Sequence, residues 1–175
     1  MNKNLLYVTY QTFPAQTANS LQTISNIRYL IKNGLQVSLY FPLREKQSTA
    51  DIKTLQNFYQ FTETFNSYGI EHPYPHGKVK FVPKLWFHLS HLLWARKFVK
   101  NSFKNDAENY FFTRSDWLAY FLARQGSNVI FECHQTSKVR NFVINKIGKL
   151  ENVKFIFLNN NLQKHYKEVK QSIVL

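Results

Sequence analysis

The sequence is poor in cysteine, glycine, proline and acidic residues. It has one cysteine, five glycines and five prolines among 175 residues. A single cysteine excludes a disulfide within the chain, which suits a reducing compartment, and few glycines and prolines predict short loops. Only ten Asp and Glu stand against 23 Lys and Arg, a net charge of +13 at pH 7. This excess suits partners that carry phosphate or other anionic groups, although the basic residues are scattered along the chain.

Long hydrophobic runs are also lacking. No apolar stretch approaches the ~20 residues that a membrane-spanning helix needs. The first residues, MNKNLLYVTYQTF, contain an apolar run that is broken at Thr9 and Gln11, which predicts a buried first strand and not a signal peptide. The cysteine and histidine spacing matches no zinc site, and we expect neither a metal nor a cofactor. The chain is therefore expected to be cytoplasmic, or peripheral on the inner face of the cell membrane.

What the sequence does contain is an alternation of short apolar runs with segments of helical periodicity. The apolar runs predict strands over 5–9, 37–41, 79–82, 110–113, 129–132, 153–158 and 173–175. Helical spacing predicts helices from residue 19 to a C-cap at Gly34, and over 51–65, 85–103, 116–124, 139–150 and 162–169. Such an alternation implies parallel strands with right-handed crossovers. We expect one α/β domain over residues 1–175, a three-layer, doubly wound parallel sheet.

The fifth predicted strand ends on a carboxylate and an imidazole. The stretch NVIFECHQTS (128–137) runs from buried positions directly to Glu132 and His134. In open α/β sheets, ligands bind outside the carboxyl ends of the strands, and this location favours a functional role for the pair. A purely structural role stays open, in which His134 bonds a loop carbonyl and Glu132 a basic neighbour.

Three stretches, taken in order, resemble one protein family. They are FPAQTANSLQTISNIRYLIKNGLQVSLY (13–40), YFFTRSDWLAYFLARQGSNVIFECH (110–134) and VKFIFLNNNLQKHYKE (153–168). In order and spacing they resemble the N-terminal half of a family-four glycosyltransferase of the GT-B architecture, and the resemblance covers nearly the whole chain. In that family the N-terminal half faces the acceptor, the C-terminal half binds the nucleotide sugar, and transfer retains the anomeric configuration.

The resemblance also implies roles for particular residues. The loop after the first strand, represented here by Ala18, Asn19 and Ser20, approaches the substrates, and His134 lies near the donor sugar as the candidate catalytic residue. It implies no metal or cofactor besides the nucleotide sugar, which is a substrate.

Further candidates follow from their place at strand ends. Arg114 and Ser115 end the fourth predicted strand at the same expected cleft. The planar fork of donors on Arg114 is suited to a phosphate or a carboxylate. Glu132 is expected to orient the loop that carries His134 and not to act as a nucleophile.

The sequence departs from the family pattern after the first strand. Many members have paired glycines where this chain has Ala18 and Asn19. Asn tolerates a left-handed backbone best among the other residues, so a tight loop is possible. Asn19 is equally suited to be the N-cap of the following helix, with Gln22 reaching back as in a capping box. Both interpretations stay open, because a helix N-terminus is itself an anion site.

A second departure concerns the donor half. The family's donor half carries two glutamates eight positions apart, and we expect that half to be absent from this chain. Glu63 and Glu71 have the same spacing, but they precede the third predicted strand and are attributed to chance. The chain alone is therefore expected to be inactive and to need a donor-binding domain or subunit.

The helix predicted near 85–103 has two apolar faces. One face is expected to dock on the sheet and comprises Leu85, Trp86, Leu89, Leu92, Leu93, Val99 and Phe103. The other, with Phe87, Trp94 and Phe98 beside Lys97 and Lys100, is suited to an anionic membrane surface. Burial of this second stripe inside the fold stays open as the alternative.

Two functions from different classes follow. The first is the acceptor-side domain of a retaining hexosyltransferase, which moves a sugar from a nucleotide sugar to an envelope polysaccharide or a lipid-linked acceptor. The alternative is a noncatalytic basic module that binds RNA or anionic polymers. RNA readers stack bases on exposed aromatic side chains, whereas most aromatic residues here fall at predicted core positions, so we expect no nucleic-acid partner.

Overall fold

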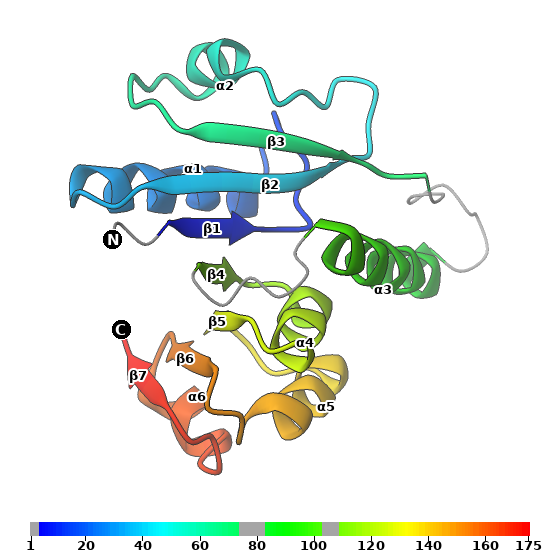
Figure 1. Ribbon diagram of the computed structural model, residues 1–175, viewed down its shortest axis with the longest axis vertical. Helices are drawn as coiled ribbons and strands as arrows, with labels where there is room; N and C mark the ends of the chain where they lie inside the picture. Colours follow the sequence, from blue (N-terminus) through cyan, green and yellow to red (C-terminus); the bar gives the residue numbers. More distant parts are fainter. Residues whose placement is uncertain (1–3, 74–82, 103–108) are drawn as a thin grey trace. The chain divides into compact units, whose positions relative to one another are not determined.

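The computed structural model describes residues 4–73, 83–102 and 109–175. The chain divides into two compact units, Met1–Trp94 and Ala95–Leu175. Each unit consists of parallel strands joined by helices (Figure 1). Each is described by itself below.

The first unit has three strands in the order β3-β2-β1. Its elements are β1 (Leu5–Val8), α1 (Ala18–Lys32), β2 (Val37–Leu43), α2 (Ile52–Tyr59), β3 (Asn66–Glu71) and the start of α3 (Pro83–Ser102), which runs across the boundary between the units. The central strand β2 pairs in parallel with both neighbours, with Leu5 opposite Val37 and Ser38 opposite Asn66. All four residues of β1 are buried, because a parallel sheet is covered on both faces.

The second unit has four strands in the order β4-β5-β6-β7. Its elements are β4 (Tyr110–Thr113), α4 (Asp116–Arg124), β5 (Asn128–Cys133), α5 (Lys138–Ile147), β6 (Val153–Phe157), α6 (Asn160–His165) and β7 (Ser172–Val174). All three pairings are parallel. The core contains fully buried aromatic side chains from neighbouring strands, namely Phe111, Phe131, Phe155 and Phe157. The predicted fold class, α/β with Rossmann-like parallel strands, is confirmed.

The helices begin where short polar side chains cap them. Thr17, Asp51, Ser137 and Asn159 each accept a hydrogen bond from the backbone N–H three residues later. These bonds satisfy donors that the first turn of a helix leaves unpaired. The N-cap of α1 is therefore Thr17, and the predicted N-cap at Asn19 is wrong.

The third strand lies elsewhere than the sequence predicts. No strand was expected between the helix over 51–65 and the strand over 79–82, but β3 occupies Asn66–Glu71 and pairs with β2 along its whole length. The sequence does not predict this strand because its residues are polar and half exposed. Pairing with β2 requires only backbone N–H and C=O groups, which leave no pattern in the sequence. The strand expected over 79–82 lies outside the described residues. Helix α2 ends at Tyr59 and not at residue 65, since Gln60 adopts a left-handed backbone with φ 54°.

The burial of α3 differs from the prediction: the expected membrane stripe is largely buried, and the expected docking face is buried only in part. Trp94 is 1% exposed and Phe98 3% exposed, so the expected aromatic membrane stripe is wrong. The indole N–H of Trp94 donates to the carbonyl of Glu71 at 3.2 Å, and its ring contacts Tyr10. Phe87 is half-buried against Tyr10, whereas Lys97 and Lys100 are exposed as expected. Two residues of the expected docking face, Leu85 and Leu89, are instead exposed.

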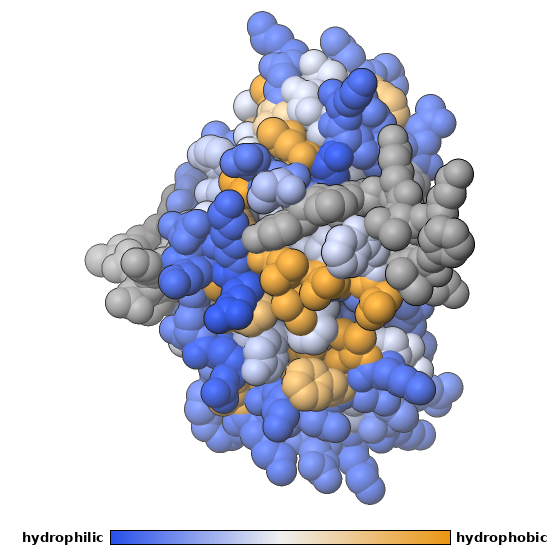
Figure 2. All heavy atoms as spheres, turned by 90° about the vertical axis from the view of Figure 1, so that its right-hand side faces the viewer, coloured by the Kyte–Doolittle hydropathy of each residue, from blue (hydrophilic) through white to orange (hydrophobic). Residues whose placement is uncertain are grey.

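The surface is mainly hydrophilic on the face drawn in Figure 2, with a smaller patch of hydrophobic side chains in its middle. This agrees with the excess of basic residues in the composition. Within the described residues, no helix is both long enough and apolar enough to span a membrane.

Candidate functional site

The carboxyl ends of β4 and β5 bring three of the predicted site residues together. Arg114 follows β4, Glu132 lies near the end of β5, and His134 follows β5. An Nη2 N–H of Arg114 donates to Nδ1 of His134 at 2.8 Å, and Nε2 of His134 is hydrogen-bonded to Oε1 of Glu132. Residues two apart in an extended chain point to the same side, which explains why Glu132 reaches His134. The imidazole thus joins a guanidinium to a carboxylate.

The hydrogen bonds define where the imidazole proton lies. A guanidinium has only N–H donors, so Nδ1 of His134 accepts with its lone pair. The ring proton is then on Nε2, which donates to Glu132. With both ring nitrogens engaged, His134 in this arrangement orients Arg114 and has no lone pair left to take a proton. Its expected contact with a donor sugar stays a prediction.

Glu132 is buried within the sheet. It is 4% exposed, and its second carboxylate oxygen, Oε2, has no hydrogen-bond partner among the described residues. A buried carboxylate is costly unless donors surround it. The bond to His134 therefore stabilises Glu132 as well as positioning the imidazole, in line with the expected orienting role.

Arg140 holds the loops of this site in place, and sequence reasoning missed it. The side chain extends from the first turn of α5 and is 7% exposed. Its Nε donates to Oδ1 of Asp116 at 2.7 Å, its Nη1 to the carbonyl of Gln135 at 3.1 Å, and its Nη2 to the carbonyl of Arg114 at 3.2 Å. One guanidinium thereby ties the segment after β4 to the segment after β5.

The electrostatics of Arg140 follow from its carboxylate partner. Burial lowers the pKa of Arg140, but the charge of Asp116 and the hydrogen bond to it outweigh burial and leave the pKa raised. Burial likewise raises the pKa of the Cys133 thiol, so this cysteine is not a reactive thiolate. No local sequence signal identifies Arg140, because its partners Asp116, Gln135 and Arg114 lie on segments that the fold brings to it.

Ser115 occupies the N-cap position of α4 without capping it through its side chain. Its backbone N–H donates to Oγ1 of Thr113 at 3.1 Å, and its carbonyl accepts from the N–H of Ala119 at 3.0 Å. Ser115 therefore lies next to Arg114 at the strand end, as predicted. Its expected contact with a substrate stays a prediction.

The other predicted binding loop belongs to the first unit. Ala18 and Asn19 lie in the first turn of α1 and are exposed. Asn19 is not among the residues with positive φ, so a left-handed backbone at Asn19, one of the two interpretations left open, is wrong. Ser20 is fully buried, and its hydroxyl donates to the carbonyl of Thr12 at 3.2 Å. Ser20 is thus a packing residue, and a cleft shared by Asn19, Arg114 and His134 stays a prediction.

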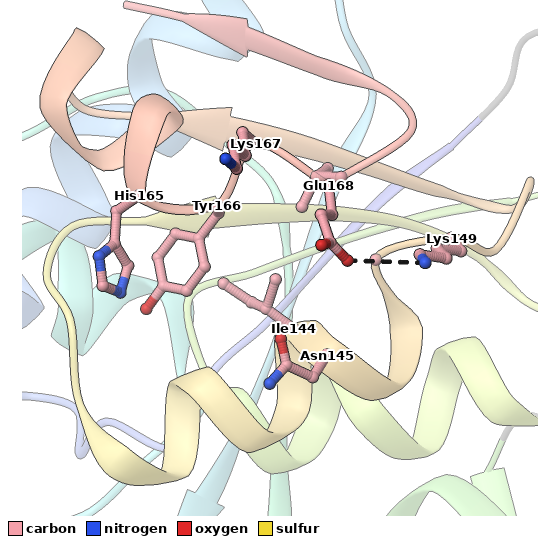
Figure 3. Close-up of a pocket in the computed structure, with 9 residues that line it drawn as sticks. Ile144, Asn145, Lys149, His165, Tyr166, Lys167 and Glu168 are labelled. Atoms are coloured by element: carbon pink, nitrogen blue, oxygen red, sulfur yellow. Dashed lines mark ion pairs between the residues drawn. The ribbon is translucent and has the colours of Figure 1, made fainter.

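A pocket of about 460 Å³ lies elsewhere in the second unit, between the end of α5 and the segment after α6 (Figure 3). Its lining includes Ile144, Gly148 and Tyr166, and Lys149 forms an ion pair with Glu168 across 3.6 Å. Because α5 starts beside the carboxyl end of β5 and runs back along the sheet, this pocket lies toward the opposite edge. None of the predicted site residues lines it.

The donor set gives no sign of a metal site. Within the part of the chain that the structure describes, no three His, Cys, Asp or Glu side chains are placed to hold a metal ion.

Comparison of the chain with protein-family models, with curated proteins and with solved structures found no match. The functional assignment therefore depends on the site at β4 and β5 and on the resemblance of the sequence motifs.

Proposed function

We propose that this chain is the acceptor-side domain of a retaining glycosyltransferase, which moves a sugar from a nucleotide sugar to an envelope polysaccharide or a lipid-linked acceptor. The observation that supports this most is the hydrogen-bonded series Arg114, His134 and Glu132 at the carboxyl ends of two adjacent parallel strands. Ligands of open α/β sheets bind at this edge, and the same residues carry the sequence resemblance.

Arg114 is the residue proposed to hold the substrate. Only one of its guanidinium donors is engaged within the described residues, in the bond to His134. The remaining N–H groups are available for two parallel hydrogen bonds to a phosphate or carboxylate. In this role Arg114 anchors the charged group of the acceptor, or the diphosphate of the donor, while the sugar is transferred.

His134 and Glu132 act in support of Arg114. The neutral imidazole fixes one edge of the guanidinium, and the carboxylate fixes the imidazole. Binding sites need supporting groups of this kind, because a small misplacement of a binding group lowers the rate strongly. The donor-binding half is proposed to come from another domain or subunit, and the cytoplasmic face of a membrane is the proposed place of action.

The proposal is tested by reconstituting sugar transfer. The full chain is assayed with the polypeptide encoded directly beside it, a panel of radiolabelled nucleotide sugars, and membrane lipid extracts as acceptors. We expect transfer by the mixture and none by this chain alone, because transfer also needs the proposed donor-binding half. No transfer from any nucleotide sugar of the panel would overturn the proposal.

A variant assigns the activity to the site. Arg114→Gln removes the charged fork, and we expect transfer to fall by roughly a hundredfold, the size of about two charge-assisted hydrogen bonds. The matched control is Arg124→Gln, which removes the same charge from an exposed position at the end of α4. Equal activity of both variants would show that Arg114 is not part of the site.

A further inference from the structure

A second cationic cluster lies at the carboxyl ends of strands in the first unit. Arg44 follows β2 directly, and Tyr10 and Thr12 lie in the segment after β1. Nε and Nη2 of Arg44 donate to Oγ1 of Thr12 at 3.2 and 2.7 Å. The guanidinium carbon lies 4.4 Å from the centre of the Tyr10 ring. The ring of His91 in α3 stacks on the Tyr10 ring, with the two ring centres 3.9 Å apart.

This cluster carries positive charge, but among the described residues no carboxylate accepts a hydrogen bond from Arg44. Arginine keeps its charge in proteins, and its Nη1 here is buried without a hydrogen-bond partner among the described residues. Glu45, the next residue, is exposed and accepts instead from the amide of Gln47. Tyr10 supplies no charge either, since burial raises the pKa of its phenol. Burial lowers the pKa of Arg44, and the charge of nearby Glu45 offsets this only in part, because burial disfavours the charged form of a cation.

Two further features make the position suitable for an anion. Thr12, which Arg44 holds through its hydroxyl, accepts through its carbonyl from Ser20 in the first turn of α1 at 3.2 Å. That first turn contains no acidic residue, so no side-chain charge offsets the positive end of the helix dipole. Arg44 is only half-buried, so part of its side chain is accessible to solvent.

We propose that Arg44, with Thr12 and the ring of Tyr10, forms an oxyanion-binding site for a phosphate or carboxylate group. The anion accepts from the guanidinium and supplies the negative charge that the cluster lacks. The site consists of residues other than Arg114, His134 and Glu132, and it does not depend on sugar transfer. If the proposed function holds, the ligand is the anionic group of the acceptor or of the donor. If it fails, the site still binds an oxyanion.

The test is a titration of the isotopically labelled full chain by nuclear magnetic resonance, with inorganic phosphate and with acetate, at constant ionic strength set by chloride. We expect saturable shifts of the Arg44 side-chain N–H and of the Thr12 and Glu45 amides. Tighter binding of phosphate identifies a phosphorylated ligand, and tighter binding of acetate identifies a carboxylate. No saturable shift of these signals with either anion overturns the proposal.

Variants separate the site from general charge effects. We expect Arg44→Gln to weaken binding of the preferred anion about tenfold or more, as for a lost charge-assisted hydrogen bond. Arg44→Lys keeps the charge but loses the planar fork of donors. We expect its affinity for the anion to lie between those of the wild type and Arg44→Gln. The matched control, Lys53→Gln, removes one exposed charge from α2 in the same unit and should leave binding unchanged. Equal losses in Arg44→Gln and Lys53→Gln overturn the proposal. If Arg44→Gln fails to fold, the wild-type titration remains decisive.

Discussion

The two units place arginines at the carboxyl ends of their strands but surround them differently. In the second unit Arg140 donates to the Asp116 carboxylate and to two carbonyls, and each of its three guanidinium nitrogens is used. In the first unit Arg44 meets a hydroxyl and an aromatic ring, and one of its nitrogens is buried without a partner. Arg140 is thus fully paired within the protein, whereas Arg44, which is half-buried, has a guanidinium nitrogen that no described residue pairs and that a ligand could pair.

The difference separates a cation that stabilises the fold from one that is ready for a ligand. A buried guanidinium is tolerated when a carboxylate and further acceptors surround it, and removing one partner then leaves an uncompensated charge. Arg140 satisfies this condition within the protein. Arg114 is intermediate, because His134 occupies one donor and the carboxylate of Glu132 is reached only through the imidazole. Predictions about each residue test whether this distinction holds.

The largest effect is expected from Arg140→Met. The substitution keeps an unbranched apolar stem but leaves Asp116 without its cation and two carbonyls without their donors. We expect the free energy of unfolding to fall by about 3–5 kcal/mol, as for breaking a buried ion pair by removing one partner. Urea unfolding followed by circular dichroism measures this loss.

The control for this experiment is Arg124→Met. Arg124 is exposed on α4, and its replacement should change the free energy of unfolding by no more than about 0.5 kcal/mol. If Arg140→Met proves as stable as Arg124→Met, the hydrogen bonds of Arg140 to the segments after β4 and β5 do not stabilise the fold. Arg140 could then not serve as the example of a stabilising, fully paired arginine against which Arg44 is compared.

A smaller effect is expected from the pH dependence of the first unit. His91 is 8% exposed, and burial lowers its pKa well below the ordinary value, assisted by the charges of Arg44, His88 and His72. In the unfolded chain this histidine takes up a proton near its ordinary pKa of about 6.5. The unfolded state therefore binds more protons in acid, and stability falls as pH drops below about 6.5.

The variant His91→Gln isolates this contribution. Below about pH 6.5, a single proton taken up only on unfolding costs at most about 1.4 kcal/mol per pH unit. Urea unfolding at several pH values between about 7.5 and 5 should show a steeper acid loss for the wild type than for the variant. Parallel curves would mean that His91 is protonated in the folded protein and that the cluster around Arg44 accepts further positive charge.

The sequence was sufficient to predict elements whose periodicity matched their burial. Helix α4 was predicted over 116–124 and has these bounds, because an acidic and a basic residue flank an apolar pattern. Glu132 and His134 were predictable as a pair, since residues two apart at a strand end share a face. Arg140 was not, because its partners come from two segments that only the tertiary fold brings together.

Local pattern was insufficient where both faces of an element look alike. Helix α3 has apolar residues on two faces, so periodicity could not decide which of them is buried. Polarity then misled the assignment, because Ser90 and His91 belong to the buried face, where Tyr10 hydrogen-bonds the Ser90 hydroxyl at 3.0 Å. Buried polar groups are satisfied by distant partners, and a partner 80 positions away cannot be read from a local window.

The smallest effect on stability is expected at Arg28, which provides a paired counterpart to Arg44 within the first unit. Nε of Arg28 donates to Oε2 of Glu63 at 2.8 Å, and Lys32 lies 3.2 Å from the other carboxylate oxygen. The hydrogen bond from Arg28 is the main cause that lowers the pKa of Glu63 from 4.5 to about 2.

A carboxylate with a lowered pKa contributes stability above its unfolded pKa, which is lost as pH falls from about 4.5 toward 2. The pair is half-buried at the surface, and its total contribution is small because water and salt screen it. Arg28→Gln should therefore raise the pKa of Glu63 toward 4.5 in a carboxyl-carbon titration by nuclear magnetic resonance, while phosphate binding at Arg44 stays as in the wild type. If phosphate binding fell as much in Arg28→Gln as in Arg44→Gln, overall charge and not an unpaired guanidinium would explain the binding, and the distinction between paired and unpaired arginines would fail.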